Sequence, residues 1–181
     1  MDAIQLLERE GIRVHFPENQ TCCGQPAYTS GYADEARAVA KVQLDLFPND
    51  WPVIVPSGSC GGMIRHHYPK LFAEDAALKA KADSLSERVF ELTEFFVKVL
   101  KVNWKGSGAT KKVALHTSCS ARREMGTHLH ARQLLAELGN VELLNHSHES
   151  ECCGFGGTFA VRQPDISAAM AGDKADALKE T

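Results

Sequence analysis

The chain has 181 residues, 44% of them hydrophobic, which is enough for one sizeable domain or for two small units sharing a core. Its formal net charge of −3 argues against nucleic-acid binding, and no apolar run approaches the ~20 residues of a membrane-spanning helix. The N-terminus is acidic and then amphipathic, unlike a signal peptide, so we expect a soluble, cytoplasmic protein.

Helices and short strands are predicted to alternate along the first part of the chain. Periodic apolar residues predict helices over 2–10, 32–47, 63–68, 74–82 and 89–100. Strands are predicted over 12–16, by alternation, and over 51–55, by a continuous apolar run. A turn at 17–21 and a loop at 56–62 follow these two strands. We interpret Glu87, Glu91 and Glu94 as an exposed helical face.

The pattern restarts after a linker at 101–112, which contains Lys, Gly and Ser. Strands are predicted over 112–116 and 141–144, and helices over 128–138 and from 165 onward. Alternating strands and helices imply an α/β fold with mostly parallel sheets. We expect two tandem, pseudo-repeated, Rossmann-like units of three layers each, over residues 1–104 and 110–181.

All six cysteines follow predicted strands, and sites in parallel sheets form at the carboxyl ends of strands. Each unit contains one Cys-Cys-Gly motif, at 22–24 and 152–154, and one Ser-Cys pair, at 59–60 and 118–119. A reducing compartment argues against structural disulfides and favours metal ligation or redox chemistry. The candidate metal ligands are Cys22, Cys23, Cys60, Cys119, Cys152 and Cys153.

Superposing the two units gives a fuller pattern of Cys, then Cys-Cys-Gly, then Ser-Cys. The first unit lacks the leading cysteine and the second lacks the trailing one, so we expect both ends of a longer protein to be missing. A naturally shortened homologue, or a misassigned start and stop, would give the same pattern. The glycines Gly24 and Gly154 are predicted to let the backbone approach a bound cluster closely.

These motifs resemble the cysteine-rich CCG domain family. The family includes iron–sulfur subunits of heterodisulfide reductase, of glycolate oxidase and of the anaerobic glycerol-3-phosphate dehydrogenase. The flanking residues are most similar to the lactate utilization protein A family. The segments that carry this resemblance are 21–27, 56–60, 116–124 and 151–159.

The resemblance implies two tandem domains, each able to hold a four-iron (4Fe-4S type) cluster. It also implies an electron-transfer subunit of a multi-subunit system that oxidises L-lactate to pyruvate, without a flavin of its own. Met63 stands where the family pattern allows a further cysteine, and a thioether is a weak, soft ligand. Each unit therefore keeps three cysteines of the pattern.

Histidines and arginines near the cysteines are secondary candidates. His116, three residues before Cys119, is a candidate for contact with a ligand, while Arg122 and Arg123 are interpreted equally as partners of an anion or as surface ion pairs. Four histidines are interpreted as solvated: His128, His130, His146 and His148. Three alternatives to electron transfer stay open: a structural zinc module, a thiol–disulfide enzyme using a vicinal pair, and a scaffold that binds no metal.

Overall fold

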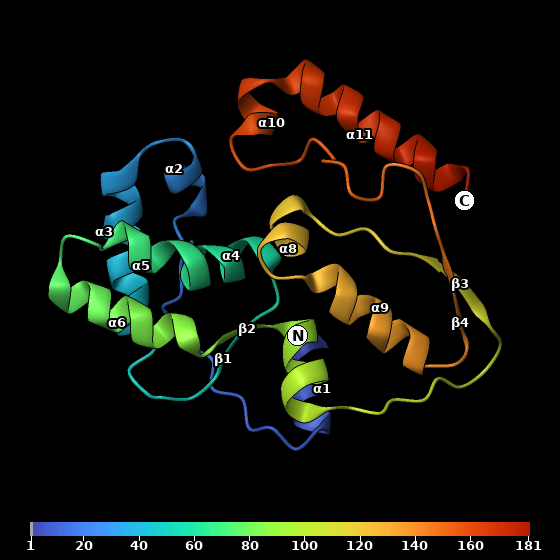
Figure 1. Ribbon diagram of the computed structural model, residues 1–181, viewed down its shortest axis with the longest axis horizontal. Coiled ribbons are helices and arrows are strands. Elements are labelled where there is room, and N and C mark those ends of the chain that lie inside the picture. Colours follow the sequence, from blue (N-terminus) through green and yellow to red (C-terminus); the bar gives the residue numbers. More distant parts are fainter. Residues whose placement is uncertain (1) are drawn as a thin grey trace.

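The computed structural model describes residues 2–181 (Figure 1). We call residues 2–104 the first half and residues 110–181 the second half. The strands of the first half are β1 (Val53–Val55) and β2 (Val89–Glu91). Its helices are α1 (Asp2–Arg9), α2 (Gln25–Thr29), α3 (Ala33–Asp45), α4 (Gly58–Gly62), the π-helix η1 (Met63–His67), α5 (Tyr68–Leu71), α6 (Ala76–Glu87), α7 (Leu92–Glu94) and the π-helix η2 (Phe95–Leu100).

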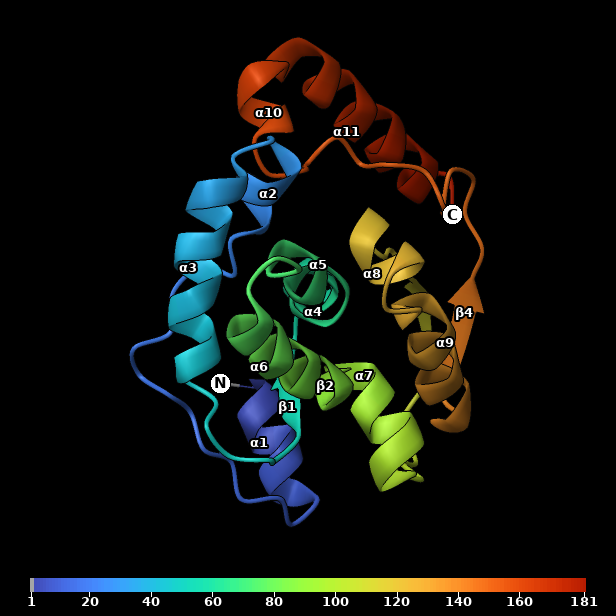
Figure 2. The same cartoon turned by 60° about the vertical axis from the view of Figure 1, so that its left-hand side comes forward.

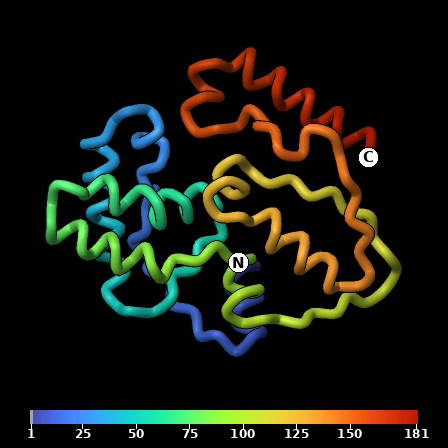
Figure 3. The backbone as a smooth tube through the Cα atoms, in the orientation of Figure 1, coloured from blue at the N-terminus to red at the C-terminus, as the bar shows by residue number. Residues whose placement is uncertain are grey.

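The second half has two strands, β3 (Lys111–Ala114) and β4 (Val141–Leu144). Its helices are α8 (Cys119–Arg123), α9 (Thr127–Glu137), α10 (Phe159–Arg162) and α11 (Pro164–Lys179). The backbone trace shows α10 and α11 (red) along one side of the molecule, with the C-terminus at the end of this layer (Figure 3).

Each half contains one pair of parallel strands. Val53 of β1 pairs with Val89 of β2, and Lys111 of β3 pairs with Val141 of β4. A helical crossover joins the two strands of each pair, as parallel pairing requires. The α/β fold class predicted from the sequence is therefore confirmed, with sheets of two strands each among the described residues.

Most of the buried apolar surface lies in the first half. Met63 and Tyr68 are fully buried in a core that also takes in residues of α3, α6 and both strands. A second cluster forms around Phe95 and Phe96 and reaches across to Leu134 on α9. Few apolar side chains of the second half are buried, so its packing depends largely on the first half.

The two halves meet where α4 crosses α8, near the centre of the molecule (Figure 2). A β-carbon on Gly58 would lie 2.3 Å from the Cα of Ala121, so the two helix backbones are in direct contact. Beside this crossing, His66 lies 3.1 Å from the carbonyl oxygen of Glu124, and His67 lies 3.3 Å from its carboxylate. The short Ser-Cys helices of the repeated pattern thus form one contact between the halves, beside the packing of α7 and η2 against α9.

Several predicted elements are wrong in detail. Residues 12–16 form no strand, because no neighbouring strand among residues 2–181 supplies hydrogen-bond partners. Residues 89–91, predicted as helix, form β2 against β1, and helix begins only at Leu92. The loop predicted at 56–62 contains α4, and the helices α2, α8 and α10 were missed. All four missed helices have five residues or fewer, too short for a periodic pattern.

Two of the three glutamates assigned to an exposed face are a further correction, whereas Glu87 is exposed as predicted. Glu91 and Glu94 are each only 5% exposed. The Glu91 carboxylate caps α7 by accepting from the backbone N–H groups of Thr93 and Glu94. Glu94 binds Arg65 at 2.8 Å and Lys98 at 2.9 Å, and these two cations compensate its burial.

Candidate thiol sites

A strand-to-helix turn places one cysteine of each half. Cys60 lies in the first turn of α4, which follows β1, and Cys119 is the first residue of α8, which follows β3. The Ser118 side chain accepts a hydrogen bond from the N–H of Ala121 and so caps α8. The repeated Ser-Cys pair therefore opens a short helix in both halves.

In the first half, the first thiol cluster consists of Cys22, Cys23 and Cys60. The Cys23 thiol donates to the Cys60 sulfur at 3.3 Å, across 37 residues of sequence. The Tyr68 hydroxyl donates to the carbonyl oxygen of Cys23 at 2.9 Å and fixes this loop from the buried side. Cys22 is exposed and Cys23 is buried, so the cluster spans the boundary between core and solvent.

The contact between the two sulfurs separates their proton affinities. Donation from Cys23, followed by hydrogen bonds with Ser57 and Ser59, lowers the pKa of Cys60 to about 6 against the opposing effect of burial. The same contact, together with burial, raises the pKa of Cys23 well above its usual range. Cys60 is therefore the thiolate of the pair and Cys23 the protonated partner.

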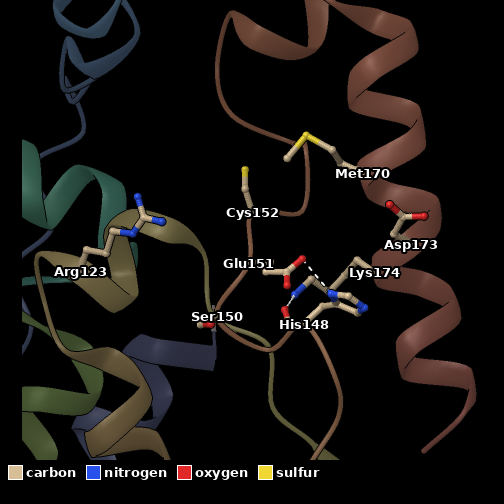
Figure 4. Close-up of a pocket in the computed structure, with 8 residues that line it drawn as sticks. All are labelled: Arg123, His148, Ser150, Glu151, Cys152, Met170, Asp173 and Lys174. Carbon is tan, nitrogen blue, oxygen red and sulfur yellow. Dashed lines mark hydrogen bonds and ion pairs between the residues drawn. The ribbon is translucent and has the colours of Figure 1, made fainter.

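In the second half, the second thiol cluster consists of Cys119, Cys152 and Cys153. Burial, and then the neighbouring Cys152 thiol, raise the pKa of Cys119, while the Arg123 charge acts in the opposite direction. Cys152 also lines a cavity of about 480 Å³ between the 148–152 loop, α8 and α11 (Figure 4). This cluster is therefore open to small molecules from solvent.

The glycine of each Cys-Cys-Gly motif adopts left-handed backbone, with φ of +84° at Gly24 and +79° at Gly154. A β-carbon on Gly154 would lie 2.4 Å from the carbonyl oxygen of Ser167 on α11, and one on Gly24 would lie 3.3 Å from that of Ala36 on α3. Each motif thus needs glycine both for the turn and for close packing against the next long helix.

The two arginines after Cys119 differ in their contacts. Arg122 pairs with Glu149 at 2.5 Å, and Arg132 binds the other oxygen of the same carboxylate at 2.6 Å. Arg123 is exposed, makes no ion pair within residues 2–181, and lines the cavity beside Cys152. Sequence reasoning could not separate their roles, because the sequence does not show which one Glu149 reaches.

Other predicted residues have mixed outcomes. Met63 is fully buried in the first-half core. His116 is exposed and makes no side-chain hydrogen bond in the described part of the chain, so its role beside the thiols stays a prediction. Two histidines predicted to be solvated, His130 and His146, are instead buried at 9% exposure. His146 is held between the carbonyl oxygens of Leu115 and Ser147.

The thiol clusters supply the type of ligand that a soft metal prefers, but too few ligands lie close together. Two thiolates on one tetrahedral metal lie ~3.8 Å apart, given metal–sulfur bonds of about 2.3 Å. The Cys23–Cys60 separation of 3.3 Å is close to that value. However, no group of three or more Cys, His, Asp or Glu side chains within residues 2–181 is gathered tightly enough to hold a metal ion. In the first cluster the Cys23 and Cys60 sulfurs meet, and Cys22 is one residue from Cys23 in sequence.

Two thiol clusters at the turns of a duplicated α/β chain define a cysteine-rich class of α/β protein. The profile of the family described as "Cysteine-rich domain" (CCG) matches residues 1–65 and 113–181, once in each half. The chain therefore belongs to the CCG cysteine-rich domain family.

Named relatives agree with this family. Lactate utilization protein A 1 of Bacillus mycoides is 41% identical over 181 residues, which is 99% of this chain and 74% of that protein. Lactate utilization protein A of Shouchella clausii is 41% identical, covering 99% of this chain and 75% of that protein. The Bacillus subtilis protein of the same name is also 41% identical, covering 98% of this chain and 74% of that protein. No helix described in the structure is long and apolar enough to cross a lipid bilayer.

Proposed function

We propose that this chain is an iron–sulfur electron-transfer component of a lactate-utilization system that oxidises L-lactate to pyruvate. The observation that carries the proposal is the contact between the Cys23 and Cys60 sulfurs at 3.3 Å, made by a loop and the first turn of α4, which are far apart in sequence. Thiolates converging from separate loops are the ligands that iron–sulfur clusters need. Relatives at 41% identity bear the name lactate utilization protein A, which supports the choice of system.

In this proposal each half is one unit, over residues 1–104 and 110–181, and its three cysteines are ligands of a four-iron cluster. A bound cluster would supply one-electron redox chemistry. Gly24 and Gly154 hold the vicinal cysteines in their turns, and Tyr68 fixes the Cys23 carbonyl from the core. Electrons would come from one protein of the lactate-utilization system and leave to another.

The test is an anaerobic assay of iron, acid-labile sulfide and zinc on the reconstituted chain, with a visible absorption spectrum. We expect iron and sulfide in equal amounts with broad visible absorption. Each of the single variants Cys60→Ser and Cys119→Ser should contain about half the iron of the unmodified chain, because each change disrupts the ligand set of one cluster. Ser120→Ala, beside Cys119, is the matched control and should keep its iron. Zinc without sulfide would identify a structural zinc module instead, and no metal at all would refute the proposal.

A further inference from the structure

The cavity beside the second thiol cluster contains two cations without carboxylate partners. Lys174 on α11 is only 6% exposed, and its ammonium donates to the carbonyl oxygen of His148. It forms no ion pair within the described residues, although an ammonium has three N–H donors. A buried charge without a counter-charge is costly unless another group compensates it.

The second cation is Arg123, which faces the same cavity from α8 on the opposite wall (Figure 4). Its neighbour Arg122 is engaged by Glu149, so only Arg123 keeps its guanidinium free. A guanidinium offers a planar pair of donors that matches the two oxygens of a carboxylate.

Two carboxylates, Glu151 and Asp173, also line the cavity, but neither forms an ion pair with Arg123 or Lys174 within residues 2–181. Glu151 instead bonds to the His148 ring at 2.8 Å. The wall between Arg123 and Lys174 is completed by Ser150, whose hydroxyl can donate or accept, and by Cys152.

We propose that this cavity binds a small carboxylate anion, whose charge is shared between Arg123 and Lys174 beside the Cys152 thiol. The volume of about 480 Å³ falls within the usual range for small-molecule sites. The inference rests on the proposed function, since it names the class of molecule that would reach the second thiol cluster. The first cluster differs, since its inner face is filled by Tyr68 and Met63.

The test measures binding of L-lactate and pyruvate by isothermal calorimetry or saturation-transfer NMR, on chain with and without reconstituted iron. Lactamide, the neutral analogue of lactate, and inorganic phosphate are compared at the same concentrations. We expect saturable binding of the carboxylates and none of lactamide. Arg123→Gln should weaken binding by roughly tenfold or more, because it removes a charge-assisted hydrogen-bonded pair.

Arg37→Gln is the matched control. Arg37 lines a separate cavity, far along the chain on α3, and its loss should leave carboxylate binding unchanged. Lys174→Met is a second variant, interpreted only if its thermal melting shows a folded chain, since Lys174 also holds the His148 loop. The inference would be overturned if the unmodified chain bound no carboxylate. It would also be overturned if Arg37→Gln weakened carboxylate binding as much as Arg123→Gln does. Phosphate binding more tightly than both carboxylates would overturn the carboxylate assignment.

The two proposals fail separately in this design. Iron and sulfide that load normally, with no carboxylate binding, would refute only the anion site. Carboxylate binding that depends on Arg123 in a chain that never takes up iron would refute only the electron-transfer proposal.

Discussion

Gly58→Ala tests whether the contact between α4 and α8 holds the two halves together. The added β-carbon would lie 2.3 Å from both the Cα and the Cβ of Ala121 and 2.9 Å from its backbone nitrogen. Because these are backbone atoms and a β-carbon, no side-chain rotation can relieve the overlap. The helices must move apart by more than about 1 Å to reach the ~3.5–4.0 Å of ordinary carbon–carbon contact.

Overpacking of this kind typically costs about 1–3 kcal/mol, and in a chain of this length each 1 kcal/mol lowers the melting temperature by roughly 2–4 °C. We therefore expect Gly58→Ala to lower the melting temperature of the chain by roughly 2–12 °C, measured by circular dichroism. Helix propensity alone predicts the opposite sign, since alanine stabilises a helix interior by about 0.5–1 kcal/mol relative to glycine.

Gly172→Ala is the matched control for this experiment. Gly172 lies within α11, and a β-carbon there would meet nothing within 4 Å. Only the propensity term applies, so this variant should melt a few degrees higher than the unmodified chain. If both variants raise the melting temperature by the same amount, α4 and α8 are not in backbone contact, and the reasoning fails.

Three other predictions follow from local contacts. In the iron-free chain, Cys60 should react with iodoacetamide at half its maximal rate near pH 6, by peptide mass mapping; a midpoint near 9 would contradict the Cys23 contact. Gly154→Ala should lower the free energy of unfolding by about 1–3 kcal/mol in denaturant titrations, because alanine is strained in left-handed backbone and its β-carbon would overlap the Ser167 carbonyl oxygen. An unchanged free energy of unfolding would refute that packing. Burial alone would raise the pKa of Glu94, but its bonds to Lys98 and Arg65 lower it overall; its stabilisation should be full above pH 4.5 and be lost as pH falls through the lowered pKa. Glu94→Gln should therefore cost roughly 2 kcal/mol at pH 7 and progressively less in acid, and a cost independent of pH would exclude the ion pairs.

The long helices and the α/β class could be predicted from the sequence because their signals are local. α3, α9 and α11 lie within three residues of their predicted bounds, since apolar spacing and glycine or proline breaks mark them. The strand β2 could not be separated from the helix after it. Val89 and Phe90 fit either pattern, and pairing with β1 decides between them.

The candidate site was predictable in its cysteines and not in its surroundings. Repetition of Cys-Cys-Gly and Ser-Cys was enough to group Cys23 with Cys60, which the structure places in contact. The position of Arg123 after Cys119 marked it, with Arg122, as a possible partner of an anion, but the buried Lys174 carried no local signal, because a lone lysine in an alanine-rich helix is ordinary. Their importance comes from α11 packing over the 148–152 loop, a contact that no sequence period indicates.

The repeated motif does not make the two thiol clusters equivalent. Cys23, at 7% exposure, packs into a core of large side chains, and Tyr68 covers its inner side. Around Cys152, the same motif is covered by α11, whose buried residues are Lys174 and Ala177. The first cluster is therefore closed on its inner side, whereas the second borders a cavity that a small molecule can enter. The two copies of the motif thus have different surroundings, because the helices packed over them differ in size and charge.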